Sequence, residues 1–334
     1  MPKTGKKGEC FRHNNPKKHL VKSLKNQEEK MNENLKNKII DAVKTETKEK
    51  LGTECIILWT DIKKNNNLIV PAISIREPFE QISPCIYLDQ MLKDFEAGNI
   101  SIQDMAGKIT ASYIKNRKKD VDILGLLNDK IILNCTVCQL INREKNKLML
   151  DNVPYKKFQD LAVVYRCILS ENNSVMASIL INNEMLKKYE INTIQLDAMA
   201  QHNTEKKGFV TCPIASVLED ISKKISGDVV PGNFTNIPDD ENLSMYILSN
   251  PSMIYGAAVM LYPNYIKQLA DSLGDDLYIF PSSIHEIIAI PAKGLEPNSL
   301  KQIVQNVNIN HVLAHEVLSD NVYKYQRGDE ITIA

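Results

Sequence analysis

The last hundred residues of the chain constrain its fold more than any other segment. Four short apolar runs there are typical of strands, at 246–249, 256–262, 277–280 and 286–290. Helical patterns follow the second and the fourth run, at 263–273 and about 298–307. Strands joined by short turns pair antiparallel. The order β-β-α-β-β-α therefore predicts an α+β fold, with antiparallel sheets and flanking helices, for this C-terminal module.

The rest of the chain shows the same mixture of helix and hairpin patterns. Apolar residues recur at helical spacing over 20–51, and β-rich runs at 55–59 and 68–75 flank Asn65–Asn67. Asparagine accepts the left-handed conformations of a tight turn. Beyond this hairpin we predict helices at 88–97 and 101–116, a strand or buried helix at 131–141, a second hairpin at 161–170 and 175–181, helices near 183–190, 193–203 and 213–226, and a long loop at 227–240.

The length of 334 residues predicts about two domains. We expect a disordered basic head at 1–19, an N-terminal α+β module at 20–150 and a C-terminal α+β module at 151–334. Residues 1–30 hold nine basic and three acidic side chains, whereas the remainder holds 32 basic and 38 acidic ones. A mildly acidic body argues against a large nucleic-acid-binding face.

The apolar runs and the cysteines indicate the cellular compartment of the protein. No apolar run approaches the ~18 residues of a membrane helix, and the polar, basic start lacks the apolar core of a secretion signal. The seven cysteines are odd in number and widely spaced, unlike a disulfide scaffold. We therefore expect a cytoplasmic protein with no membrane partner.

Two motifs resemble metal or redox sites and are better explained as structural. Cys135 and Cys138 form a single CxxC pair within apolar neighbours, whereas structural zinc takes four ligands. His311 and His315 are one helical turn apart, but Val312 stands where a zincin motif requires glutamate. We expect a buried thiol pair, a solvated helix face and no metal. The sequence also lacks GxGxxG, GxxxxGK[ST] and GxSxG, so no cofactor is expected.

The most suggestive polar run is Ser282, Ser283, His285 and Glu286, between the last two predicted strands. Serine, histidine and glutamate can supply a nucleophile, a base and an orienting carboxylate. Strand alternation, however, places Ser283 and His285 on one face and Glu286 on the other, and no oxyanion hole is visible. We assign no catalytic residue and keep the four as candidate ligand-binding residues. The alternative is a purely structural polar turn.

Five stretches of the chain carry a resemblance to a known family. They are 65–77 (NNNLIVPAISIRE), 82–91 (ISPCIYLDQM), 142–166 (NREKNKLMLDNVPYKKFQDLAVVYR), 256–291 (GAAVMLYPNYIKQLADSLGDDLYIFPSSIHEIIAIP) and 317–325 (VLSDNVYKY). In order and spacing they resemble an uncharacterised family of low-GC Gram-positive anaerobes, catalogued only as a domain of unknown function, over roughly residues 31–333. The resemblance implies no activity. Asn67 stands where we expect glycine, and asparagine also accepts positive φ, so the turn should be kept.

These observations favour a non-enzymatic cytoplasmic binding or regulatory protein that docks an unknown protein or small molecule. The support is the lack of a cofactor fingerprint, a metal set and paired catalytic carboxylates in the sequence. The alternative is an enzyme with an unfamiliar site around Ser283, His285 and Glu286. A second alternative is weak, non-specific nucleic-acid association through the basic head.

Overall fold

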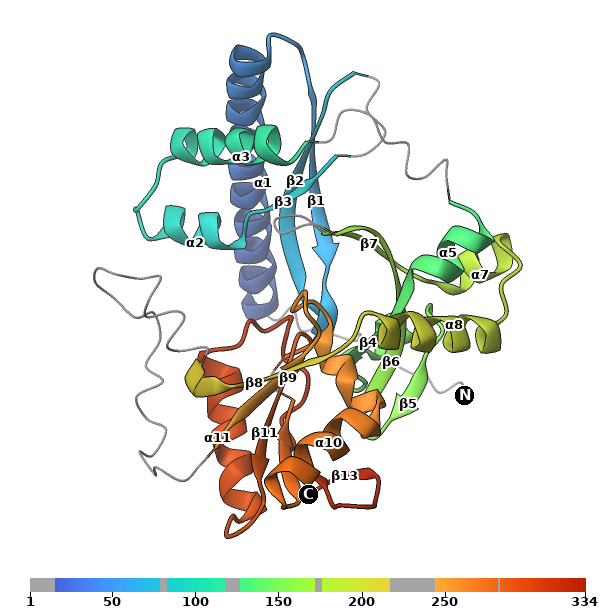
Figure 1. The fold of residues 1–334 in the computed structure, drawn as a ribbon. Helices are drawn as coiled ribbons and strands as arrows, with labels where there is room; N and C mark the ends of the chain where they lie inside the picture. The colour runs from blue at the N-terminus through green and yellow to red at the C-terminus, as the bar shows by residue number, and fades with distance from the viewer. Residues whose placement is uncertain (1–15, 79–82, 118–126, 172–175, 217–243, 282) are drawn as a thin grey trace, which may run out of the picture. The chain divides into compact units, whose positions relative to one another are not determined.

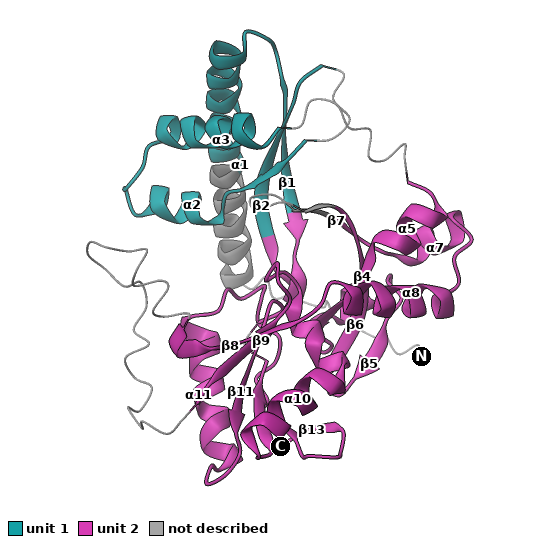
Figure 2. Cartoon of the chain, viewed as in Figure 1, with its two compact units in different colours: residues 1–61, 70–121 teal, residues 62–69, 122–334 magenta. Residues whose placement is uncertain are grey.

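The computed structural model describes most of the chain in two compact units (Figures 1 and 2). The described residues are 16–78, 83–117, 127–171, 176–216, 244–281 and 283–334. Unit 1 consists of Met1–Asp61 and Val70–Val121, and unit 2 of Ile62–Ile69 and Asp122–Ala334. The tip of the first hairpin therefore belongs to unit 2, although most of that hairpin belongs to unit 1.

Unit 1 packs helices on one face of a three-stranded sheet in the order β1-β2-β3. Its elements are α1 (Pro16–Leu51), β1 (Ile56–Lys63), β2 (Ile69–Arg76), β3 (Cys85–Tyr87), α2 (Asp89–Glu96) and α3 (Ile102–Asn116). The core joins α1 and α3 to the sheet through Ile39, Ile73, Ile86, Ile109 and Tyr113. Helix α3 begins at a capping box, in which Ser101 and Asp104 satisfy each other's backbone N–H groups. The helices predicted at 88–97 and 101–116 are thus confirmed.

Unit 2 contains two antiparallel sheets with helices around them. Its helices are the 3-10 turn η1 (Asn65–Asn67), α5 (Asp129–Cys135), α6 (Lys147–Leu150), α7 (Asn183–Lys188), α8 (Thr193–Lys206), η3 (Gly256–Leu261), α10 (Pro263–Leu273) and α11 (Pro297–Asn310). One sheet orders β4 (Thr136–Asn142), β6 (Leu161–Glu171) and β5 (Lys156–Phe158), and β7 (Met176–Leu180) also pairs with β6. The other has the order β13-β12-β10-β11-β9-β8, with β8 (Val210–Pro213), β9 (Tyr246–Ser249), β10 (Leu277–Phe280), β11 (Ile287–Pro291), β12 (Tyr323–Tyr325) and β13 (Ile331–Ile333).

Strands β10 and β11 lie at the centre of the six-stranded sheet and are covered on both faces. Leu277 and Ile287 point into the large core that includes Ile266 of α10. Tyr278 and Ile290 point to the opposite face, where they pack with Leu300 of α11. Apolar residues on both faces of a strand are the pattern of a central, covered strand, so the turn between β10 and β11 is held by two cores.

The α+β class with antiparallel sheets is confirmed, and the predicted β-β-α-β-β-α order is wrong at one element. The run at 256–262 is a 3-10 helix, η3, not a strand. Its residues from Gly256 to Met260 are buried on all sides, and a short, fully buried apolar run has no periodicity that distinguishes helix from strand. The three-residue strands β12 and β13 are too short to give a pattern and were not predicted.

Two boundaries also differ from expectation. The ambiguous run at 131–141 contains both alternatives, because α5 ends at Cys135 and β4 starts at Thr136. The compact units divide near residue 121, whereas we expected a boundary at residue 150. The reason is that β4 pairs with β6 over seven residues, which joins 136–142 to the C-terminal part.

Some predictions fall outside the described residues. Helix α1 begins at Pro16 rather than at residue 20, while residues 1–15 of the predicted head are not described. Residues 217–226 of a predicted helix and the predicted loop at 227–240 also lie outside the described residues. Among the helices that are described, none is long and apolar enough to cross a membrane.

Candidate functional site

The hairpin tip at Asn65–Asn67 is fixed by side-chain hydrogen bonds within unit 2. Asn66 and Asn67 have φ values of 61° and 55°, so the left-handed turn predicted for this asparagine run is confirmed. The backbone N–H of Asn66 donates to Oδ1 of Asn146 at 2.8 Å, and Nδ2 of Asn146 donates to Oδ1 of Asn66 at 3.0 Å. Asn146 is fully buried. The two asparagines therefore form a reciprocal pair.

The same tip holds the segment that follows α11. Nδ2 of Asn66 donates to the carbonyls of Ala314 and Val317 at 2.9 and 2.8 Å, and Nδ2 of Asn65 donates to the carbonyl of His315 at 3.0 Å. Carbonyls outside regular structure need such partners when water is excluded. The segment 314–317 is thus positioned by two asparagine side chains.

The turn between β10 and β11 is closed by its own side chains. The Ser283 hydroxyl donates to Oε1 of Glu286 at 2.7 Å and accepts from the backbone N–H of His285 at 2.9 Å. Ser283 is 4% exposed, and Glu286 is half-buried. Ser282 lies outside the described residues. The hydroxyl of Ser283 is therefore engaged with Glu286 and the backbone, and the imidazole of His285 has other partners.

His285 is bonded through both ring nitrogens. The backbone N–H of Tyr255 donates to Nδ1 at 3.3 Å, and Nε2 lies 3.5 Å from Oε1 of Glu316. Nε2 of the ring is therefore placed to donate to the Glu316 carboxylate. The ring also stacks on the ring of Tyr255 at 5.8 Å, and Ser249 donates to the His285 carbonyl at 2.7 Å.

Glu316 is the centre of this cluster, although no motif of the sequence includes it. Nε2 of His315 lies 3.8 Å from the same Oε1, and the three side chains are 22–27% exposed. The hydrogen bond from His285 lowers the pKa of the Glu316 carboxyl, burial opposes this, and the charges of His285, His315 and Lys64 lower it further. We call His285, His315 and Glu316 the His-Glu cluster.

The prediction that His311 and His315 share a solvated helix face is wrong. Helix α11 ends at Asn310, and His311 is its C-cap. His311 is exposed, whereas His315 is half-buried beside Glu316. The adjacency of His315 and Glu316 in sequence was the available signal, but their partner His285 comes from a distant turn.

A close backbone contact ties the Ser283–Glu286 turn to η3. A Cβ added to Gly256 would lie 2.0 Å from Oγ of Ser249, 2.5 Å from the His285 carbonyl and 2.6 Å from the Asn250 nitrogen. Only glycine allows this approach. Gly256 therefore positions the element that supplies Tyr255 to the His-Glu cluster.

A second polar cluster fixes the chain beyond Glu316. The Asp160 carboxylate, in the turn between β5 and β6, accepts from Ser319 at 2.7 Å, from Asn321 at 3.0 Å and from the buried Tyr323 hydroxyl. These residues come from the stretches 142–166 and 317–325 that carry the family resemblance. Their hydrogen bonds give those stretches a structural role.

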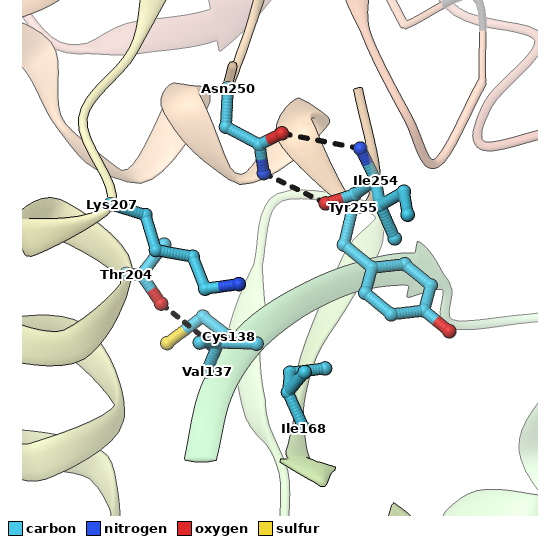
Figure 3. A pocket seen from close by; sticks show the side chains of 8 residues that line it. All are labelled: Val137, Cys138, Ile168, Thr204, Lys207, Asn250, Ile254 and Tyr255. Carbon is cyan, nitrogen blue, oxygen red and sulfur yellow. Dashed lines mark hydrogen bonds between the residues drawn. The ribbon is translucent and has the colours of Figure 1, made fainter. Parts of the chain in front are cut away.

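Tyr255 also lines a small cavity (Figure 3). It has a volume of about 10 Å³, the room of one water molecule, and is lined by residues that include Cys138, Thr204, Asn250 and Tyr255. Thr204 accepts from the Cys138 N–H at 2.8 Å, and Asn250 donates to the Ile254 carbonyl at 2.7 Å. These polar groups are engaged with one another. The cavity is too small for a ligand beyond water.

The CxxC cysteines do not lie in a metal cluster of the described residues. Cys138 is buried, and burial raises the pKa of its thiol to about 12. Cys135 is half-buried at the end of α5. Within the ranges that the structure describes, no group of three or more histidine, cysteine or acidic side chains is arranged to hold a metal ion.

Comparisons with known proteins identify only a family. A family model described as "Family of unknown function (DUF5688)" matches residues 36–327. Neither the curated proteins nor the solved structures contain a significant match.

Proposed function

The chain belongs to the family of unknown function DUF5688, and from that premise we propose that it is a non-enzymatic cytoplasmic binding or regulatory protein. Its partner is a polar small molecule or a polar protein surface. The proposed binding face is the His-Glu cluster, with Ser283 and Glu286 beside it. The observation that carries this proposal is the position of two imidazoles and a carboxylate, each about a quarter exposed, on two rigidly held segments.

Rigidity supports a binding role. The segment with His315 and Glu316 is held by Asn65 and Asn66, and the turn with His285 is held by Ser249 and the close approach of Gly256. Groups that are already fixed in the free protein lose little freedom on binding, which favours affinity. Imidazole and carboxylate groups recognise polar partners through hydrogen bonds.

The enzyme alternative has one observation in its favour, the pairing of His285 with a carboxylate. Covalent catalysis by a serine also needs the hydroxyl beside the imidazole. The Ser283 hydroxyl instead bonds Glu286 and the backbone of His285. The binding proposal needs no such nucleophile, and for that reason we prefer it.

The test is thermal unfolding of the full chain with a panel of polar small molecules and short polar peptides, at neutral pH. A ligand that binds the folded state raises Tm. We expect at least one compound to raise Tm of the unmodified chain and to lose this effect in Glu316→Gln. His311→Gln is the matched control, because His311 is exposed on the same segment.

Two results would contradict the proposal. A stabilising compound that acts equally on Glu316→Gln would bind elsewhere. Conversion of a stabilising compound into product, lost in Glu316→Gln, would favour the enzyme alternative.

A further inference from the structure

The structure brings Cys135 to a cysteine that its sequence motif does not include. Helix α5 ends at Cys135, and the next residue, Thr136, lies opposite Cys167 in the antiparallel pairing of β4 with β6. Both cysteines pack in the same apolar core. Cys135 also contributes to raising the pKa of the Cys167 thiol, after burial, which is the largest cause. Cys138, in contrast, lies on β4 beside Thr204 of α8.

We propose that Cys135 and Cys167 form a reversible disulfide when a hydroperoxide reaches the protein, and that the Cys135–Cys138 motif does not. Opposed Cα atoms in antiparallel strands are about 4.5–5.5 Å apart, and a disulfide needs a Cα separation of about 4.4–6.8 Å. Cys135 is one residue from a position directly opposite Cys167. Both thiols are free in the structure.

Burial decides the order of the chemical steps. Cys135 is half-buried, whereas Cys167 is fully buried, so the hydroperoxide meets Cys135 first. The Cys135 sulfur takes an oxygen atom and becomes a sulfenic acid, while the O–O bond breaks and water or an alcohol leaves. The Cys167 sulfur then forms the S–S bond as the S–O bond breaks, and its proton leaves with the hydroxide as water. Two thiols are oxidised, and one hydroperoxide is reduced.

The environment of Cys167 argues against its reacting first with the hydroperoxide. Burial raises the pKa of its thiol to about 12, which disfavours direct attack on an oxidant in solution. A sulfenic acid on Cys135 would be an electrophile packed against the same apolar core as Cys167. In a reducing compartment, disulfides of this kind are transient and regulatory.

The disulfide would join the end of α5 to β6. The other end of α5 carries Asn128 and Asp129, which line an open hollow of about 420 Å³ together with Lys188, Tyr189 and Gln195. Oxidation would therefore fix one wall of this hollow. The expected effects are a higher Tm and reversal by dithiothreitol.

The experiment treats the full chain with graded hydrogen peroxide, alkylates the remaining thiols, and maps peptides by mass spectrometry without reduction. Exposed Cys212 is an internal measure of oxidation. We expect a peptide linking Cys135 to Cys167 in the unmodified chain and in Cys138→Ser. The link should be absent from Cys135→Ser and should disappear after dithiothreitol.

The proposal is overturned if Cys135 links to Cys138, or if no link forms at peroxide levels that oxidise Cys212. Circular dichroism establishes whether Cys135→Ser is folded. If it is not folded, Cys167→Ala gives the same test, because it removes the other partner of the proposed disulfide. The peptides linked in Cys138→Ser also show whether Cys135 pairs with Cys167 when Cys138 is absent.

Discussion

Two polar turns of unit 2 use their side chains in opposite ways. At Asn65–Asn67, the side chains bond groups 80 and about 250 residues away, on Asn146 and the segment 314–317. At Ser283–Glu286, the serine and glutamate bond each other across three residues. The first turn joins distant parts of the unit, and the second mainly satisfies itself. The polarity of a turn therefore does not predict which turn holds the segment that carries His315 and Glu316.

The largest effect is expected from Gly256→Ala, which would break the anchoring of the second turn. The added methyl group has backbone neighbours at 2.5 and 2.6 Å, and backbone cannot move aside cheaply. We expect a loss of about 3 kcal/mol in the free energy of unfolding, typical of severe overpacking. Urea unfolding followed by circular dichroism measures it.

Gly107→Ala is the control for this substitution. Gly107 lies inside α3, and an added Cβ there would meet its nearest atom at 4.0 Å. Alanine in a helix interior should stabilise by about 0.5–1 kcal/mol. Equal effects of the two substitutions would show that the close approach at Gly256 is not the constraint we describe.

Asn66→Ala should have the next largest effect, because it removes the long-range bonds of the first turn. It removes one acceptor of the buried Asn146 Nδ2 and leaves the carbonyls of Ala314 and Val317 without this donor, and alanine is strained at φ 61°. We expect a loss of about 2 kcal/mol, measured by urea unfolding. Asn67→Gly, at φ 55° on an exposed residue, should change stability by less than about 0.5 kcal/mol. A comparable loss of stability in both variants would show that the long-range bonds of Asn66 do not stabilise the unit.

Ser283→Ala should cost less, about 1–2 kcal/mol, because only short-range partners are lost. The variant leaves the Glu286 carboxylate and the His285 N–H without the hydroxyl. Ser299→Ala, exposed on α11, is the control. Unchanged stability in Ser283→Ala would mean that the second turn does not depend on its own side chains.

Glu316→Gln tests the His-Glu cluster through the pH dependence of stability. It should change the free energy of unfolding least among these variants. The folded pKa of Glu316 is lowered from its usual 4.5, chiefly by the His285 hydrogen bond. Its ionised form therefore stabilises the fold fully above pH 4.5, and this contribution is lost as the pH falls through the lowered value. Urea unfolding should show a gap between the two proteins at neutral pH that shrinks under acid. A gap independent of pH would contradict the pairing.

The sequence predicted local structure well and long-range partners poorly. Pro263 and Gly274 correctly bounded α10, and Gly274 has the positive φ of a helix C-cap. The positive φ values of Asn66 and Asn67 followed from residue type. The partners of Asn66 did not, because residues 146 and 314–317 carry no local signal of a distant turn.

The candidate site shows the same limit. His285 and Glu286 were selected because they are adjacent to serine in sequence. Glu316 was not selected, and its contact with His285 depends on the pairing of the Ile284 N–H with the Glu316 carbonyl at 2.9 Å. Contacts of that kind are set by how the sheet and the segment after α11 pack.

The most direct test of this comparison is a double-mutant cycle between Asn66 and Asn146. The Asn66→Ala, Asn146→Ala and double variants are unfolded in urea and followed by circular dichroism. The side chains share the bond from Nδ2 of Asn146 to Oδ1 of Asn66, whereas the bond from the Asn66 backbone N–H survives Asn66→Ala. We therefore predict a coupling energy of about 1 kcal/mol, within the range of directly bonded neighbours. Additive effects of the two substitutions, with a coupling near zero, would contradict the claim that this pair fixes the hairpin tip.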